Sequence, residues 1–145
     1  GAKILSDQLT KKGRKENSME KYEVKDEQRI GPAHGPYSQG LVCDKLFFTG
    51  IIGSYGPEGE LDDSVYEQTK KIFENAELLL GQAHGSLKDL VKVTVYLLNI
   101  SDFDEMNRAY KECLTERPLP ARATIAVKEM LPGVKVEMEL VAYID

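Results

Sequence analysis

The chain has 145 residues, of which 41% are hydrophobic and 30% charged, and its formal net charge is −5. This length suffices for one domain with a single hydrophobic core, and the composition is ordinary for a globular protein. No apolar run approaches the roughly 20 residues of a membrane-spanning helix, which excludes a membrane-spanning role. Residues 1–18 contain five basic and two acidic side chains, a net of +3, which leaves −8 for the rest and disfavours binding to nucleic acid.

The first 18 residues contain few apolar side chains and no sustained period, and Met19 follows them. We interpret residues 1–18 as a disordered extension or an added leader, and residues 19–145 as a single domain. A targeting peptide is the alternative. This segment has no apolar core of the secretory kind, and it contains Asp7 and Glu16, whereas organelle transit sequences are poor in acidic residues.

Short strands and turns are predicted at the start of the domain. Residues 21–25 fit a strand, whereas residues 31–36 form a loop because their prolines and glycines cannot continue a helix. Two further strands are predicted at residues 40–43 and 45–49, with Asp44 at the turn between them.

Two amphipathic helices separated by one strand follow. The first begins at a polar cap in residues 62–64 and carries apolar side chains at helical spacing as far as Leu80. Apolar residues alternate in residues 91–97, which predicts a well-packed strand. The second helix covers residues 103–113 and ends before Pro118.

Two strands close the chain, at residues 122–127 and 134–144, on either side of a turn at residues 131–133. The whole order predicts an α+β fold, with a mixed six-stranded sheet and both helices packed on one face. The other face must then meet water or a partner.

Alternation along the last two strands suggests which residues lie on this uncovered face. The even-numbered residues of 134–144 are apolar, which leaves Glu137 on the opposite side. The odd-numbered residues of 123–127 are also apolar, which leaves Arg122 and Thr124 opposite them. If both apolar sets face the helices, Arg122, Thr124 and Glu137 lie together on the uncovered face.

Arg122 is the strongest candidate for a ligand-binding residue. Its planar guanidinium can hold a carboxylate through two parallel hydrogen bonds and stays charged at physiological pH. A carboxylate such as Glu137, placed near a reacting carbon, can position or deprotonate water. The alternatives are a salt bridge for Arg122 and a solvated strand position for Glu137, and spacing alone leaves both open.

Several short segments form a set in a fixed order. They are Gly35-Pro36-Tyr37-Ser38-Gln39-Gly40, Phe48-Thr49-Gly50, Asp102-Phe103 with Asn107 and Tyr110, Pro120-Ala121-Arg122-Ala123-Thr124-Ile125-Ala126-Val127, Leu131-Pro132 and Val136-Glu137-Met138-Glu139. Together, over residues 30–145, they resemble the RidA family, also called YjgF or L-PSP. The specificity of the match comes from the complete set, because any single motif would be weak evidence.

The resemblance implies a chorismate-mutase-like homotrimer with active sites between subunits. Many members hydrolyse enamine or imine acids, such as 2-iminobutanoate and 2-iminopropanoate, to 2-oxo acids and ammonia. By motif, Arg122 binds the substrate carboxylate and Glu137 orients the attacking water. The remaining site residues would line a pocket built from two chains, with Tyr37 also a catalytic candidate. They are Tyr37, Thr49, Gly50, Asn107 and Thr124.

Two positions depart from the family pattern. Thr124 stands where members often have a cysteine, so chemistry that requires a thiol there is excluded, although its carbonyl and hydroxyl can still contact a substrate. Ile51-Ile52 follow Gly50 where many members have a glutamine and a nearby proline, which leaves the substrate side chain open.

No cofactor and no metal are expected. Cys43 and Cys113 form no metal-binding pair, and Cys113 lies on the apolar stripe of a helix, which favours a reduced thiol and a cytoplasmic location. Two alternatives to the deaminase remain open. One is an L-PSP-type endoribonuclease, and the other is a non-catalytic trimer that senses a small carboxylate or holds unfolded proteins.

Overall fold

The computed structural model describes residues 20–145, so the interpretation of residues 1–18 lies outside the described part of the chain. The elements are β1 (Lys21–Val24), α1 (Glu27–Ile30), β2 (Gly40–Cys43), β3 (Leu46–Thr49), α2 (Val65–Gly81), β4 (Leu90–Leu97), α3 (Phe103–Cys113), β5 (Ala121–Ala126) and β6 (Val136–Tyr143). Short 3-10 turns at Leu87–Asp89 and Ile100–Asp102 precede β4 and α3. No helix among the described residues is long and apolar enough to cross a membrane.

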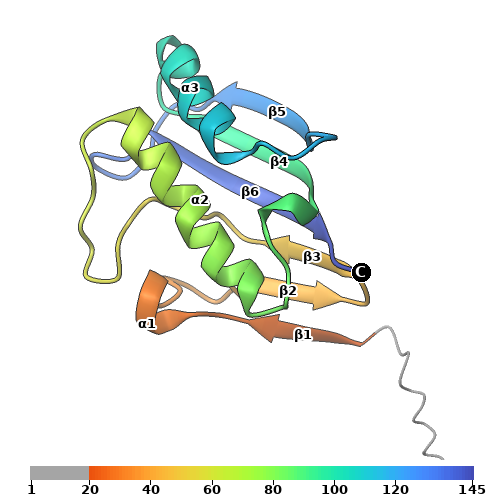
Figure 1. Ribbon diagram of the computed structural model, residues 1–145. Coiled ribbons are helices and arrows are strands. Elements are labelled where there is room, and N and C mark those ends of the chain that lie inside the picture. Colours follow the sequence, from red (N-terminus) through yellow and green to blue (C-terminus); the bar gives the residue numbers. More distant parts are fainter. Residues whose placement is uncertain (1–19) are drawn as a thin grey trace, which may run out of the picture.

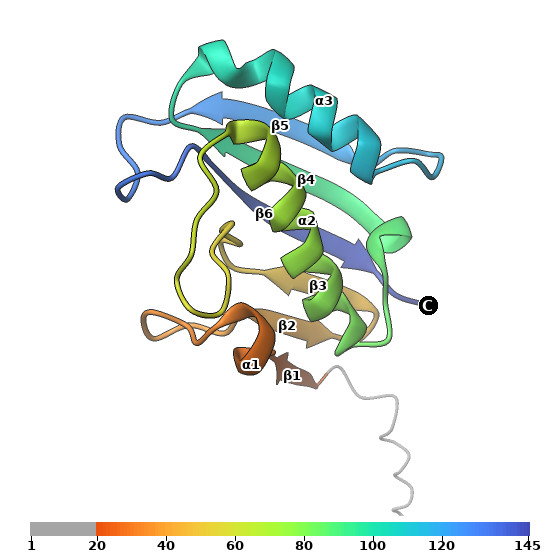
Figure 2. The ribbon, with the colours of Figure 1, turned by 60° about the vertical axis from the view of Figure 1, so that its left-hand side comes forward.

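The six strands form one mixed sheet in the order β1-β2-β3-β6-β4-β5. Neighbouring strands are antiparallel except β4 and β5, which are parallel and joined through α3. Both α2 and α3 lie on the same face of this sheet (Figures 1 and 2). The predicted α+β architecture is therefore confirmed.

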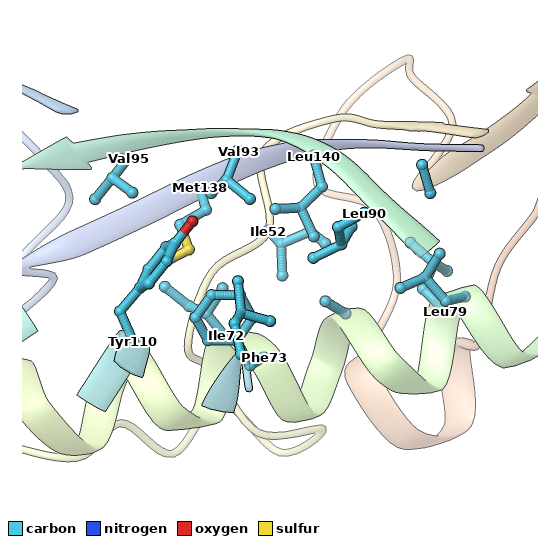
Figure 3. Packing of buried hydrophobic residues seen from close by; sticks show 14 of the residues in the cluster. Ile52, Ile72, Phe73, Leu79, Leu90, Val93, Val95, Tyr110, Met138 and Leu140 are labelled. Atoms are coloured by element: carbon cyan, nitrogen blue, oxygen red, sulfur yellow. The ribbon is translucent and has the colours of Figure 1, made fainter. Parts of the chain in front are cut away.

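The main core lies between α2 and the sheet. The helix is capped by Ser64, the residue before Val65, whose hydroxyl accepts a hydrogen bond of 3.0 Å from the backbone N–H of Glu67. Its apolar stripe packs beneath β4 and β6 (Figure 3), and α3 joins the core where the Phe73 and Tyr110 rings meet edge to face at 5.4 Å. The most deeply buried side chains include Phe47, Ile72, Phe73, Leu79, Leu80, Val93, Val95, Leu97, Met106, Met138 and Leu140.

The opposite face of the sheet has no helix over it. Phe48 is 39% exposed there, Tyr143 48% and Ile125 50%, although all three are large apolar or aromatic residues in strands. A monomer rarely leaves so much apolar sheet surface in contact with water. Of the two expected neighbours of this face, water and a partner, the exposed apolar side chains favour a partner, which stays a prediction.

Two local features differ from the sequence predictions. A short helix, α1, was missed because its four residues are too few to show a period; Asp26 caps it by accepting from the backbone N–H of Arg29. Val91 does not belong to the buried side of β4 and is 45% exposed. A register irregularity between Leu90 and Lys92 turns it outward.

The predicted orientation of β5 is wrong. In the parallel register with β4, Arg122 lies beside Val93 and Thr124 beside Val95, and both valines are fully buried on the helix side. Arg122 and Thr124 therefore face the helices, and Ile125 faces the uncovered side. The prediction assumed that the apolar side of β5 faces the helices. It is wrong because β5 is an edge strand, and its apolar side lies on the uncovered face of the sheet.

Candidate functional site

Arg122 is held by one face of α3. Its Nη1 donates a 2.7 Å hydrogen bond to the side-chain Oδ1 of Asn107. Its guanidinium carbon also lies 5.6 Å from the ring centre of Phe103 and 4.8 Å from that of Tyr110. These three helix residues are spaced i, i+4 and i+7, so they share one side of α3 and fix the arginine together.

Most of the hydrogen-bonding capacity of Arg122 is unused among residues 20–145. Within the described chain, no carboxylate oxygen lies within salt-bridge distance of its guanidinium. A guanidinium carries five N–H donors, and the contact with Asn107 employs Nη1 alone. The intramolecular salt bridge considered for Arg122 is therefore wrong, and a planar edge remains for a carboxylate ligand.

Two hydroxyl groups on the same side of the sheet also lack partners. The Thr124 Oγ1 and Tyr110 Oη atoms are both buried, and neither makes a hydrogen bond to any described residue. Burial raises the pKa of the Tyr110 hydroxyl, and the charge of Arg122 offsets part of that rise. Buried polar atoms normally have a partner, so an additional group is needed to satisfy this region.

A cavity of about 640 Å³ opens beside Arg122. Asn107 and Tyr110 line it from α3, and Leu114, Thr115, Leu119 and Pro120 line it from the segment that leads into β5. Its size is within the usual range for small-molecule sites. Arg122 therefore borders a space that a small carboxylate can enter.

Glu137 belongs to a different region. It lies on the uncovered face of β6, opposite Tyr96 of β4. Its carboxylate makes no hydrogen bond or ion pair with any residue in 20–145, and partial burial raises its pKa above the ordinary value. A partly desolvated carboxylate without a partner is suited to holding water or accepting a proton.

Tyr96 and Glu139 form a hydrogen bond beside Glu137 that the sequence analysis did not identify. The Tyr96 hydroxyl donates to the Glu139 carboxylate, and this bond is the main reason that the pKa of Tyr96 is raised. The two residues are on different strands and face the same side of the sheet. They are 43 positions apart in the sequence, so no local sequence pattern indicates that they are in contact.

Tyr37 and Gly50 lie next to each other at the end of β3. A side chain added at Gly50 would approach the Tyr37 ring to 3.7 Å, and the backbone N–H of Gly50 donates to the carbonyl of Gln39 at 3.2 Å. Tyr37 is 50% exposed, and its hydroxyl accepts from the backbone N–H of His34 at 3.1 Å. Two of the residues predicted to line the site, Tyr37 and Gly50, are therefore brought together within one chain.

Thr49 has a structural contact in addition to its predicted role. Its hydroxyl accepts a 2.9 Å hydrogen bond from the backbone N–H of Leu140. This bond holds β3 to β6 just before the pairing resumes between Ile52 and Met138. Glu137 directly precedes Met138, so the segment after Thr49 lies beside the strand that carries the glutamate.

The candidate residues thus form two groups. The first, which we call the arginine group, consists of Asn107, Arg122 and Thr124 on the helix side of the sheet. The second, the glutamate group, consists of Tyr37, Thr49, Gly50 and Glu137 at the end of β3 and on β6. Strands β5 and β6 are separated by β4, which places them roughly 10 Å apart in the sheet. One chain alone does not join the two groups.

Other kinds of site find little support among the described residues. No group of three or more histidine, cysteine, aspartate or glutamate side chains in residues 20–145 is arranged to hold a metal ion. Cys43 and Cys113 are both free, and burial raises the pKa of the Cys113 thiol. A reactive thiolate would need the opposite shift.

The sequence and the fold both match known proteins. Residues 27–144 match the family model described as Endoribonuclease L-PSP. The chain is 41% identical over 111 residues to a RutC family protein of Pyrococcus abyssi, covering 75% of this chain and 87% of that protein. It is 31% identical over 127 residues to Reactive Intermediate Deaminase A, chloroplastic, of Arabidopsis thaliana, covering 86% and 67% of the two chains.

A solved structure with the same fold contains a small ligand. The crystal structure of E. coli TdcF with bound serine matches with a TM-score of 0.78 and 28% sequence identity, over 86% of this chain and 99% of that chain. The fold is therefore shared with a protein of known structure whose crystal structure contains a bound amino acid.

Proposed function

Because this chain belongs to the RidA family, the family of the Endoribonuclease L-PSP model, we propose that it is a reactive-intermediate deaminase. Its substrates would be 2-imino acids and the enamines in equilibrium with them. Its products would be 2-oxo acids and ammonia. The observation that carries this proposal is the unpaired guanidinium edge of Arg122, fixed by Asn107 and two aromatic rings beside an open cavity.

Arg122 would bind the substrate carboxylate. Phe103, Asn107 and Tyr110 restrict the guanidinium before any ligand arrives, so little freedom is lost when the carboxylate binds. The serine bound in TdcF also carries a carboxylate, which agrees with a site for small amino-acid derivatives.

Glu137 would position the water. Oxygen attacks the iminium carbon, the C=N bond becomes a C–N single bond, and a proton passes from the water to the glutamate. That proton then moves to nitrogen, and the C–N bond breaks as ammonia leaves. The remaining hydroxyl proton is taken up by the departing ammonia, which becomes ammonium, as the C=O bond of the product forms. Because the iminium carbon is already electrophilic, we propose that orientation and proton transfer suffice and that no metal takes part.

The site would be completed between subunits of a homotrimer. Arg122 and Glu137 of one chain are on different sides of the sheet, whereas the mechanism requires both at one substrate. The exposed apolar side chains around Ile125 and Phe48 provide a surface on which a second copy can pack. A site shared by two copies satisfies both requirements.

A trapping assay tests the proposed activity. A threonine dehydratase generates 2-iminobutanoate in the presence of semicarbazide, which captures the imine before it hydrolyses. The protein is expected to reduce semicarbazone formation and to accelerate release of 2-oxobutanoate, whereas the Arg122→Ala variant is not. Equal trapping with the wild-type protein and with buffer would contradict the proposal.

Two further measurements separate the alternative functions, namely binding of a 2-oxo acid and cleavage of RNA. Binding of 2-oxobutanoate without acceleration of imine decay would indicate a sensor. Metal-independent RNA cleavage by repurified protein, lost on Arg122→Ala, would indicate the endoribonuclease. The net negative charge of residues 19–145 weighs against the endoribonuclease. The cytoplasmic location stays a prediction.

A further inference from the structure

The cavity beside Arg122 has an unusual distribution of charge. Three basic side chains line it: Lys111 from the last turn of α3, Arg117 from the following segment, and Arg122 from β5. No aspartate or glutamate lines it. The domain as a whole is acidic, since residues 19–145, these three cations included, carry a net charge of −8. This cavity is therefore a local positive site on a negative protein.

None of the three cations is neutralised by another residue of the part of the chain that the structure describes. Six other basic side chains of the described part form ion pairs, including Lys70 with Glu112 and Arg108 with Glu105, whereas some exposed lysines form none. Lys111, Arg117 and Arg122 have no carboxylate within ion-pair distance among residues 20–145. Three like charges around one space repel each other, and an anionic ligand would relieve that repulsion.

One carboxylate does not use all three cations. Arg122 can hold it alone through a planar bidentate contact, and Arg122 is the cation that Asn107 fixes in position. Lys111 and Arg117 lie on other parts of the cavity wall, in a space of about 640 Å³ that is larger than a two- or three-carbon acid requires. They are placed to meet a second negative group on the same molecule.

We propose that this site selects 2-imino acids whose side chain ends in a second carboxylate, with Arg122 binding the first carboxylate and Lys111 and Arg117 the second. The inference rests on the proposed deaminase function and specifies its substrate class. A carboxylate is the second anion to expect, because imines that form from ordinary amino acids can carry one when the parent is aspartate or glutamate. Hydrolysis itself is unchanged: water adds, the C=N bond is replaced by C=O, and ammonia leaves.

The test compares two imines in the trapping assay. Oxidases generate 2-iminoglutarate from glutamate and 2-iminobutanoate from 2-aminobutanoate, with catalase present to remove peroxide. We expect the wild-type protein to have a kcat/KM about tenfold higher for the dicarboxylate. In Arg117→Gln and Lys111→Gln this ratio should fall by about three- to tenfold, and it should fall further in the double variant.

Lys88→Gln is the matched control, because Lys88 is an exposed lysine that does not line the cavity. It removes the same charge and should leave the ratio at the wild-type value. Circular dichroism of each variant verifies that the fold is intact. A second readout, calorimetry with the stable products, should show tighter binding of 2-oxoglutarate than of 2-oxobutanoate, and this difference should shrink in Arg117→Gln.

The outcomes separate the two proposals. If wild-type protein hydrolyses 2-iminobutanoate but has no preference for the dicarboxylate, the substrate class is wrong and the deaminase function stands. The same conclusion follows if Lys88→Gln and Arg117→Gln change the ratio equally. If neither imine is hydrolysed, the deaminase function fails, and calorimetry then decides whether the cavity binds a dianion at all.

Discussion

Arg122 and Glu137 lie on opposite sides of one sheet. Arg122 is beside the buried Val93 on the side of the helices, whereas Glu137 is opposite Tyr96 on the uncovered side. Neither residue has a charged partner within the described chain, and each is partly shielded from water. A reaction that uses both must bring two copies together, and this relationship is directly testable.

Mixing two inactive variants should restore activity. Arg122→Ala and Glu137→Gln are each expected to be inactive alone, because every site then lacks one residue. After the two are denatured and refolded together at equal concentrations, about one quarter of the shared sites receive an intact arginine and an intact glutamate. Activity of about one quarter of wild type is therefore expected in the trapping assay. No recovery, with trimers verified by sedimentation, would mean that each chain forms its own site.

Arg122→Lys should lose most of the activity although the charge is kept. Lysine cannot form the two parallel hydrogen bonds to a carboxylate, nor does its shape reproduce the contact with Asn107. We expect kcat/KM to fall by about 100-fold or more, with a raised KM. Arg108→Lys is the control, because Arg108 pairs with Glu105 on the outer surface of α3 at 2.8 Å. An active Arg122→Lys enzyme would show that charge alone is sufficient.

Glu137→Gln should lower activity and raise stability at neutral pH. Burial raises the pKa of Glu137 in the folded protein, so the folded state holds this proton more tightly than the unfolded state. The ordinary pKa of the carboxyl is 4.5, and the pKa in the folded protein is higher. As the pH rises through these two values, ionisation of Glu137 in the folded state lowers the free energy of unfolding. The glutamine variant avoids that cost at neutral pH and gains nothing in acid, where both forms are protonated.

Urea denaturation of wild type and Glu137→Gln at neutral and acid pH measures this difference, at one protein concentration. Activity of the variant should fall by roughly 100-fold or more, the range for loss of a general base. The wild-type kcat/KM should decline on the acid side at a pH above 4.5, because Glu137 must be ionised to position water. A stability gain in acid alone would contradict the assigned cause of the shift.

Two glycines should respond to alanine in opposite directions. A Cβ at Gly40 would lie 2.7 Å from Val24 Cγ2 and 3.0 Å from Phe47 Cζ, so β1 would have to move away from the core. We expect Gly40→Ala to lower the free energy of unfolding by about 1–3 kcal/mol. Gly81, the last residue of α2, has no atom within 4 Å of the added carbon. Gly81→Ala should raise the free energy of unfolding by about 0.5–1 kcal/mol. Chemical denaturation measures both, and equal effects would contradict the contacts at Gly40.

Local periodicity was sufficient for most of the secondary structure. The stripe from Val65 to Leu80 determines the buried face of α2, and the even-numbered residues of β6 determine which side of that strand enters the core. These patterns are informative because each element buries one face against a single core. The motifs around Arg122 and Glu137 likewise indicated these two charged residues as site candidates, and their roles stay predictions.

Tertiary structure decided where those residues face and what they touch. Alternation in β5 cannot tell its two sides apart, because one side packs beneath α3 and the other is an apolar surface left uncovered. Only the register with β4 places Arg122 on the helix side, against Asn107 and Tyr110. The grouping of Lys111, Arg117 and Arg122 around one cavity also depends on how α3 returns to β5. The sequence alone thus identified the charged residues and the period of each element, but register and packing, which join distant segments, determined the faces of the site.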